Sequence, residues 1–258
     1  MKQQDIFSGI ERFGLAGLVG GDRDAPVAEH EAPAPASVDG IDIKNYVFPK
    51  RFDCPVCGCG FNSYVNKEKK TRLVKVETDL RPVYTPVDPN MYDVVICPVC
   101  GYASTREKFP TIIKQNRMLI QEKISPYFRH YEYPMKLTID MAIERYKLVL
   151  LNLMVQKPKD GERAYMCLKI MWLYNSKGDE ANETIFAKLA LKGFMDAIVK
   201  ESPPIMGMNY DTLNYLIGAL AAKLKEKETS MKYLSSVITS GTASSSLKDK
   251  ARLLKEEM

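Results

Sequence analysis

Cysteines are the residues of this sequence whose type and spacing indicate chemistry most directly. Cys54 and Cys57 flank a Pro-Val dipeptide, Cys97 and Cys100 do the same, and both pairs read CPVCG. In such a turn the proline fixes the backbone, and the glycine permits a conformation that points backbone N–H groups at the sulfurs. Two turns of this kind that face each other supply four thiolates in tetrahedral geometry. The duplicated motif therefore predicts a metal site with the ligands Cys54, Cys57, Cys97 and Cys100.

Disulfide bonds and a redox-active CxxC couple are the alternatives for these cysteines. A redox couple needs one pair beside a helix N-terminus and does not explain the second copy. Asp5, Glu11 and Arg12 interrupt the start of the chain, where an export signal needs an unbroken apolar run. We therefore expect a cytoplasmic protein, and in that reducing compartment disulfides are rare.

Zinc is favoured over iron as the bound metal, although rubredoxin-type iron sites use the same paired turns. The cysteine pairs precede a long helical region, and no flavin motif or second redox motif is visible. A closed four-thiolate zinc site has no vacant position for a substrate, so its role is expected to be structural.

The remaining cysteines and both histidines fall outside this predicted site. When CPVCGC is placed over CPVCGY, Cys59 takes the position of Tyr102, so it is interpreted as a thiol that does not bind the metal, with a spare-ligand role left open. Cys167 lies in an apolar helical stretch and is interpreted as a core residue. His30 and His130 are isolated, and neither is expected to be a ligand.

Catalytic motifs are not found in the sequence. There is no P-loop, no HExxH, no GxSxG and no convincing dinucleotide fingerprint after a strand. Two histidines provide little acid/base chemistry near neutral pH. Carboxylates such as Asp79, Asp88 and Asp93 are interpreted as solvated loop residues. The sequence thus gives no support to a catalytic function.

Short strands are the elements expected to position the cysteines. Residues 61–65 and 72–78 are rich in β-branched and aromatic side chains, and the NKEKK stretch between them is typical of a hairpin turn. Residues 92–96 are predicted as a third strand that leads into the second cysteine pair. Together these features predict a zinc ribbon over residues 46–109.

Beyond Pro110 nearly the whole chain has helical periodicity. The expected helices cover residues 110–124, 138–156, 161–177, 181–200, 210–225, 228–239 and 244–257. Their short connections favour antiparallel helical hairpins. The fold class is predicted as α+β, with a small antiparallel zinc ribbon followed by an all-α tetratricopeptide-like helical hairpin array over residues 110–258.

The likeness to tetratricopeptide repeats depends on the segment that begins at Asn214. Ile217 and Gly218 match the Leu-Gly step of the repeat, and Ser230 and Leu234 stand at its A-x3-F positions. Asn214 and Ala221 depart from the Trp and Tyr of the pattern. A plain helical bundle is the alternative.

The first 45 residues divide into two parts. Residues 21–45 are rich in Pro, Ala and acidic residues and cannot bury enough apolar surface to fold, so a disordered linker is expected. Residues 1–20 carry Ile6, Ile10 and Phe13 at helical spacing, which predicts a short amphipathic segment. That segment either docks on a partner protein or packs on its own domain.

Nucleic-acid binding is a further candidate function. Residues 46–130 contain fourteen basic and eight acidic residues in a chain whose net charge is +5. The basic side chains near the expected hairpin are Lys67, Lys69, Lys70, Arg72, Lys75 and Arg81. Tyr64 and Tyr84 lie among them, but so do three acidic residues, which weakens the indication.

No apolar run approaches the length of about 18 residues that a membrane helix requires.

Several motifs resemble a known bacterial family. They are CPVC followed by Phe61, DLRPVY at 79–84, YDVVICPVCGYA at 92–103, and the IMWLYNSKGDE and YLIGAL segments of the helical region. Together they resemble the family called domain of unknown function 2225 over about residues 46–240. The resemblance implies a cytoplasmic bacterial protein with a zinc-binding ribbon and tetratricopeptide-like helices, and no particular activity.

The sequence therefore predicts a non-enzymatic zinc-binding adaptor. Its helical hairpins and N-terminal segment are expected to bind a protein or peptide partner. A nucleic-acid-associated zinc ribbon and a rubredoxin-like iron electron carrier are the alternatives.

Overall fold

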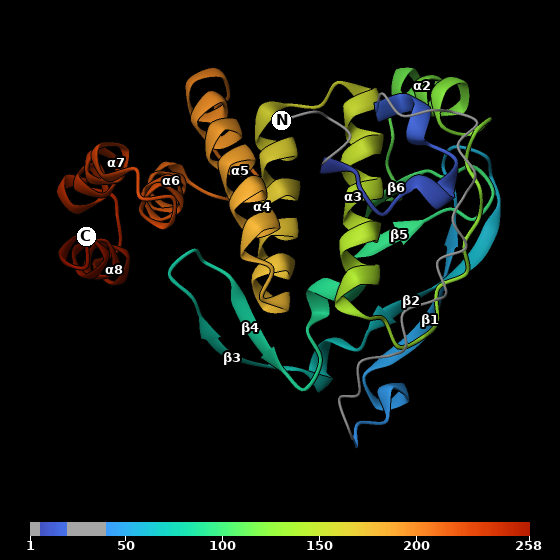
Figure 1. Ribbon diagram of the computed structural model, residues 1–258, viewed down its shortest axis with the longest axis horizontal. Helices are drawn as coiled ribbons and strands as arrows, with labels where there is room; N and C mark the ends of the chain where they lie inside the picture. Colours follow the sequence, from blue (N-terminus) through green and yellow to red (C-terminus); the bar gives the residue numbers. More distant parts are fainter. Residues whose placement is uncertain (1–5, 20–39) are drawn as a thin grey trace. The chain divides into compact units, whose positions relative to one another are not determined.

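Both cysteine pairs lie in loops that connect antiparallel strands. The computed structural model describes residues 6–19 and 40–258 (Figure 1). Strand β1 (Val47–Asp53) pairs with β2 (Gly60–Asn66), and their register ends with Asp53 opposite Gly60. Strand β5 (Val94–Ile96) pairs with β6 (Ala103–Thr105), and their register ends with Ile96 opposite Ala103. The two connecting loops, residues 54–59 and 97–102, are therefore equivalent.

The predicted hairpin between residues 61–65 and 72–78 is wrong. Strand β2 pairs with β1, while β3 (Arg72–Val76) pairs with β4 (Pro82–Thr85). Between β2 and β3 lies the short 3-10 helix η4 (Glu68–Lys70) instead of a hairpin turn. The sequence pattern did not reveal β1 as a strand, because it contains Pro49 and two neighbouring basic residues. Proline and exposed charges are untypical of strand interiors.

The described residues form two compact units. Unit 1 contains the described residues up to Arg72 together with Tyr84–Lys157, and unit 2 contains Leu73–Val83 together with Pro158–Met258. The sequence placed the domain boundary between residues 109 and 110, whereas the compact units divide at Lys157. The reason is that helices α2 (Lys114–Lys123) and α3 (Ile139–Gln156) pack with the ribbon: α3 contacts α2, β5 and β6.

The N-terminal segment packs on its own unit. In the described part, 6–19, it contains the 3-10 helices η1 (Glu11–Phe13) and η2 (Ala16–Val19). Its buried apolar side chains are Phe7, Ile10, Phe13 and Leu15. Lys147 on α3 donates from Nζ to the Ser8 carbonyl at 2.7 Å, and Arg12 forms an ion pair with Glu144. The described part of this segment therefore packs on its own unit, and docking on a partner protein stays a prediction.

The predicted linker lies mostly outside the described residues. Its described end, residues 40–45, includes the 3-10 helix η3 (Ile43–Asn45), which the Asp42 side chain caps. The expectation of disorder for residues 21–39 falls outside the described ranges.

Unit 2 contains the helices α4 (Asp160–Lys177), α5 (Glu180–Lys200), α6 (Tyr210–Lys223), α7 (Lys227–Thr239) and α8 (Ser245–Glu256). Helices α4 and α5 pack side by side, and α6 packs with α7 and α8 (Figure 1). With α2 and α3, each of the predicted helices is present. The α+β class with a helical array is thus confirmed.

Helices α6 and α7 approach closely at the positions that matched the repeat pattern. A Cβ atom on Gly218 would lie 2.7 Å from Cδ2 of Leu234, so only glycine fits without displacing that side chain. The buried Ser230 hydroxyl donates to the Gly218 carbonyl at 2.8 Å. Small residues at these points therefore permit the close helix contact that the sequence indicated.

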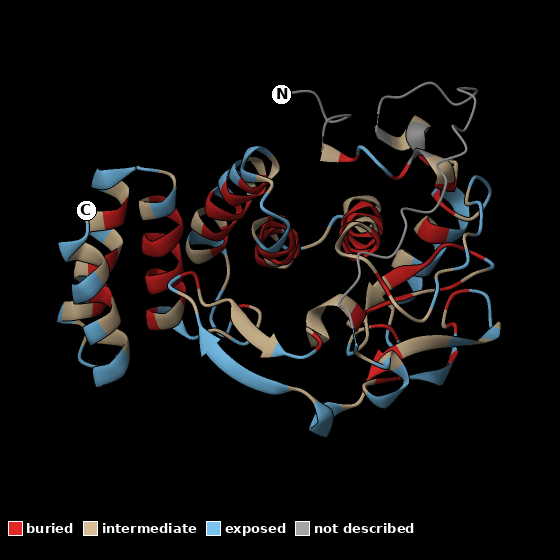
Figure 2. Cartoon of the chain, turned by 60° about the horizontal axis from the view of Figure 1, so that its bottom comes forward, coloured by how far each residue is buried: buried red, intermediate tan, exposed pale blue. Residues whose placement is uncertain are grey.

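The β3–β4 hairpin is anchored in unit 2 by its turn. Leu80 packs against the apolar cluster that includes Tyr215 and Leu234, and Arg81 donates to the Ser176 hydroxyl at 2.5 Å. All five residues of β3, by contrast, are exposed (Figure 2).

Among the described helices, none has the length and apolar character needed to cross a membrane.

Candidate metal centre

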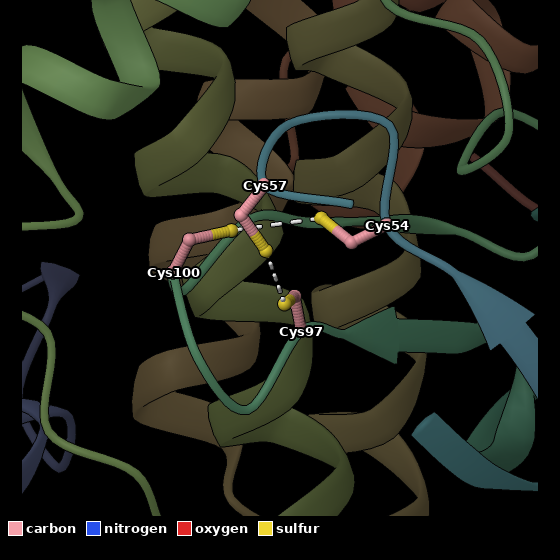
Figure 3. A group of neighbouring side chains, drawn as sticks. All are labelled: Cys54, Cys57, Cys97 and Cys100. Atoms are coloured by element: carbon pink, nitrogen blue, oxygen red, sulfur yellow. Dashed lines mark hydrogen bonds between the residues drawn. The ribbon is translucent and has the colours of Figure 1, made fainter. Parts of the chain in front are cut away.

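Four cysteine side chains converge between the two hairpin loops of unit 1 (Figure 3). The Sγ atoms of Cys54, Cys57, Cys97 and Cys100 all lie within 4.8 Å of one another. The Cys54–Cys100 and Cys57–Cys97 sulfur distances are both 3.6 Å. Sulfurs bound tetrahedrally at about 2.3 Å from a zinc ion lie about 3.8 Å apart, so these four fit an ion of that size. The predicted cysteines are thus positioned to bind a metal ion.

Each loop is a tight turn that its glycine makes possible. Gly58 and Gly101 adopt φ values of +77° and +71°, which side chains disfavour. Their N–H groups donate to the carbonyls of Cys54 and Cys97, at 2.9 and 3.1 Å. The repeated CPVCG sequence therefore folds into the same turn twice.

The last residues of the two turns, Cys59 and Tyr102, also occupy equivalent positions. Cys54 N–H donates to the Cys59 carbonyl at 2.9 Å, and Cys97 N–H donates to the Tyr102 carbonyl at 2.8 Å. Cys59 is thus the structural counterpart of Tyr102. Its thiol approaches the Gly60 carbonyl at 3.6 Å and lies outside the group of four sulfurs.

The other sulfur and imidazole groups lie elsewhere. Cys167 is buried in α4, and burial raises the pKa of its thiol to about 12, which suits a core residue. His130 is exposed, and His30 lies outside the described residues.

The close approach of the sulfurs couples their protonation. The Cys100–Cys54 hydrogen bond lowers the pKa of the Cys54 thiol and raises that of the Cys100 thiol. The Cys54 sulfur also accepts the Val56 N–H at 3.4 Å. Because a metal ion takes thiolates as ligands, binding at this group would release the protons that the thiols share.

Asn152 of α3 holds the second cysteine turn. This side chain is fully buried, its Nδ2 donates to the Gly101 carbonyl at 3.2 Å, and its Oδ1 accepts the Ala103 N–H at 3.1 Å. The amide therefore satisfies one backbone group inside the turn and one just after it.

Two side chains of the 114–125 region support the turns as well. Ser125 donates from Oγ to the Cys100 carbonyl at 3.0 Å, and Gln121 donates from Nε2 to the Val56 carbonyl at 3.1 Å. Sequence reasoning missed both residues and Asn152. The one available signal was Asn152 itself, an amide within the apolar run 148–155 of an expected helix.

Five of the six basic residues near the expected hairpin separate into two groups, and the sixth, Arg72, is exposed on β3. In unit 1 an open cavity of about 360 Å³ is lined by Phe48 and by the basic residues Lys50, Lys67, Lys69, Lys70 and Arg106. Glu68 lines it as well and forms an ion pair with Arg106 at 3.4 Å. In unit 2, Lys75 and Arg81 pair with Glu77 at 2.8 and 3.5 Å. The structure thus brings three of the six predicted residues together with two that were not predicted.

Comparison with known proteins identifies a bacterial family. The family model described as an uncharacterized protein conserved in bacteria (DUF2225) matches residues 47–258. A curated relative, an uncharacterized protein of Borreliella burgdorferi, is 26% identical over 87 residues, which are 31% of this chain and 31% of the relative. The chain thus spans less than a third of that relative's length. No solved structure matches the chain.

Proposed function

This chain belongs to the DUF2225 family of bacterial proteins, and we propose that it is a non-enzymatic adaptor in which a structural zinc ion organises unit 1 and the helical unit 2 binds a protein or peptide. The observation that carries the proposal is the group of four cysteine sulfurs, all within 4.8 Å of one another.

Zinc is supported by the donor set. Four thiolates in two CPVC turns are typical of closed structural sites, in which no position is left for a substrate. Strands β5 and β6 contain three residues each, too few for a stable hairpin in isolation. A bound ion would therefore contribute much of the free energy that holds these strands in place.

Partner binding is supported by residues 73–76 of strand β3, which belong to unit 2. Leu73, Val74 and Val76 have exposed fractions of 48%, 54% and 40%, unusually high for three apolar side chains in one short strand. Strand β3 belongs to a two-stranded sheet, so among the described residues one of its edges has no neighbouring strand. An extended peptide segment of a partner can add to such an edge and cover these side chains.

Metal analysis of purified protein tests the first half of the proposal. We expect one zinc ion per chain, loss of zinc in Cys57→Ser and full retention in Cys59→Ser, the matched control in the same turn. A red, redox-active preparation that contains iron would instead support the rubredoxin-like alternative. Loss of metal in Cys59→Ser would show that the ligand set is wrong.

Affinity purification from the native cell tests the second half. Val74→Lys places a charge on β3, and Val199→Lys places the same charge on another exposed valine of unit 2, on α5. Partners that bind through β3 should be lost with Val74→Lys and kept with Val199→Lys. Equal recovery with both variants would remove β3 as the binding surface.

Nucleic-acid binding is the second candidate, because the open cavity in unit 1 combines an exposed Phe48 with four lysines and with Arg106, which pairs with Glu68. Phosphates would contact the lysines, and a base could stack on the aromatic ring. Lys69→Glu should then weaken binding to mixed DNA and RNA fragments and reduce its salt dependence, while Lys192→Glu, an exposed site in unit 2, should not. If the unaltered protein does not bind at low ionic strength, this candidate is excluded.

A further inference from the structure

A second candidate site is a cavity of about 540 Å³ in unit 1, which none of the four clustered cysteines lines. Its volume falls in the range of small-molecule sites, about 300–1,000 Å³. Six aromatic side chains contribute to its wall: Phe13, Phe61, Tyr64, Phe128, Tyr131 and Tyr133. They come from the N-terminal segment, from β2 and from the loop that precedes α3. The aromatic part of the cavity wall is thus built from three separate parts of the chain, and Pro49, Ile96 and Pro98 add apolar contacts from other segments.

Arg145 of α3 also lines this cavity, and it is only 4% exposed. One guanidinium nitrogen, Nη2, donates to the Val94 carbonyl, whereas Nε has no hydrogen-bond partner in the described part of the chain. The guanidinium carbon lies 5.1 Å from the centre of the Tyr133 ring. Arg145 is therefore a buried cation with unused hydrogen-bonding capacity.

No carboxylate among the described residues forms an ion pair with Arg145. The neighbouring Arg12, which is also largely buried, does have such a partner in Glu144. Burial lowers the pKa of Arg145, but a guanidinium keeps its charge even in protein interiors. An unpaired buried charge is costly to folding, so its retention at a cavity wall indicates that an anion from outside the chain neutralises it.

We propose that this cavity binds a small aromatic carboxylate. The carboxylate would accept hydrogen bonds from the planar guanidinium of Arg145, which matches a carboxylate in shape. The ring would lie among the aromatic side chains, which favour edge-to-face and offset contacts. Asn62 and Ser63 of β2 also line the cavity and supply further polar groups.

Glu132 is the one carboxylate that lines the cavity, and it opposes an anionic ligand. Its side chain is exposed to solvent, so its charge is screened by water and salt more than the buried charge of Arg145. Glu132→Gln should consequently strengthen binding of the carboxylate, and this gain should shrink as salt is added.

Binding should also involve the N-terminal segment. Phe13 forms part of the cavity wall and stacks on Phe128 and Tyr133, with ring centres 6.2 and 6.4 Å apart. A ligand that contacts this wall binds the docked segment in preference to the undocked one and therefore stabilises it. Slower hydrogen exchange of residues 6–19 in the presence of ligand is the expected signature.

Calorimetric titration of the full chain tests the proposal with 3-phenylpropanoate and its neutral counterpart, 3-phenylpropanamide. We expect one binding site, with the acid bound at least about tenfold more tightly than the amide. Arg145→Met should remove this preference. Arg117→Met, an exposed arginine on α2 that does not line the cavity, should leave it unchanged.

Asn62→Trp keeps the test decisive if Arg145→Met does not fold. Asn62 is exposed on β2, so tryptophan should be tolerated there, and its ring would occupy the cavity while Arg145 remains intact. Binding of the acid should then weaken at least about tenfold. Equal affinity for acid and amide, a preference that survives in Arg145→Met, unchanged binding in Asn62→Trp, or no binding of the acid at millimolar concentration would each overturn the proposal.

Discussion

Replacing Asn152 with alanine tests whether α3 holds the second cysteine turn in its metal-binding conformation. The substitution removes the hydrogen bonds to the Gly101 carbonyl and the Ala103 N–H, whose distances are 3.2 and 3.1 Å. Both residues are buried, so the two backbone groups would lose their partners without gaining water. Each such group costs about 1–3 kcal/mol, so the opening free energy of this hairpin should fall by about 2–6 kcal/mol.

Hydrogen exchange measured by mass spectrometry on the β5–β6 region reports this local free energy. Competition with a zinc-binding dye reports the metal affinity, which should fall about 10- to 100-fold, as for other residues that support metal ligands. Asn116→Ala is the matched control, because this half-buried amide on α2 bonds to the Gln156 side chain and to no cysteine turn. A loss below about 1 kcal/mol with unchanged zinc affinity in Asn152→Ala would refute the reasoning.

Three further predictions concern the metal and unit 2. A strong chelator should remove the hydrogen-exchange protection of β5–β6. Helices α4–α8 should stay protected, because unit 2 has its own buried core. If β5–β6 stayed protected after chelation, the metal would not be structural. Gly218→Val should lower the free energy of unfolding of unit 2 by about 1–3 kcal/mol in thermal denaturation, because its Cβ would lie 2.7 Å from the Leu234 side chain. Gly241→Val is the control and should cause no such loss, because a Cβ at Gly241 has open space around it. Asp79 was expected to be a solvated loop residue, but it is buried, and burial raises its pKa above the ordinary value of 3.8. Its stabilising contribution is therefore present at low pH and is lost as the pH rises through the raised value. Asp79→Asn, which can still accept the Arg81 N–H, should therefore raise the melting temperature at pH 7 more than at pH 4; an equal effect at both would argue against this origin.

The cysteine group could be predicted from the sequence because its geometry is encoded locally. Each CPVCG stretch specifies its own turn, and the repetition of the motif in the sequence reappears as equivalent loops between paired strands. The supporting side chains could not be predicted in the same way. Asn152 lies on α3 and Ser125 lies just after α2, and each donates to a backbone carbonyl far away in the chain. Only the folded packing of α3 with α2, β5 and β6 brings them there.

Strand pairing was the part of the fold that the sequence concealed. A hairpin between neighbouring strands is the default expectation for residues 61–65 and 72–78, and the polar NKEKK stretch is compatible with such a turn. The competing partner of β2 is β1, whose proline and charged side chains hide its strand character. Likewise, β6 has only three residues, too short for any periodic pattern. Each strand thus pairs with its neighbour in sequence, and the wrong hairpin was predicted because β1 was not recognised as a strand.

The chain between the two cysteine pairs raises the question of how strongly the metal and unit 2 depend on each other. Residues 58–96 separate the pairs, and 73–83 within them belong to unit 2, where Leu80 and Arg81 anchor the hairpin turn. A metal that joins the two cysteine pairs closes the loop of residues 58–96. Pairing of β3 with β4 removes less than half of the flexible length of this loop. Halving a flexible loop changes its closure free energy by only about 0.6 kcal/mol. The coupling between metal binding and β3–β4 pairing is therefore smaller than about 0.6 kcal/mol. The DLRPVY sequence is therefore best explained by the anchoring of its own hairpin in unit 2, and metal removal should change the melting temperature of unit 2 very little.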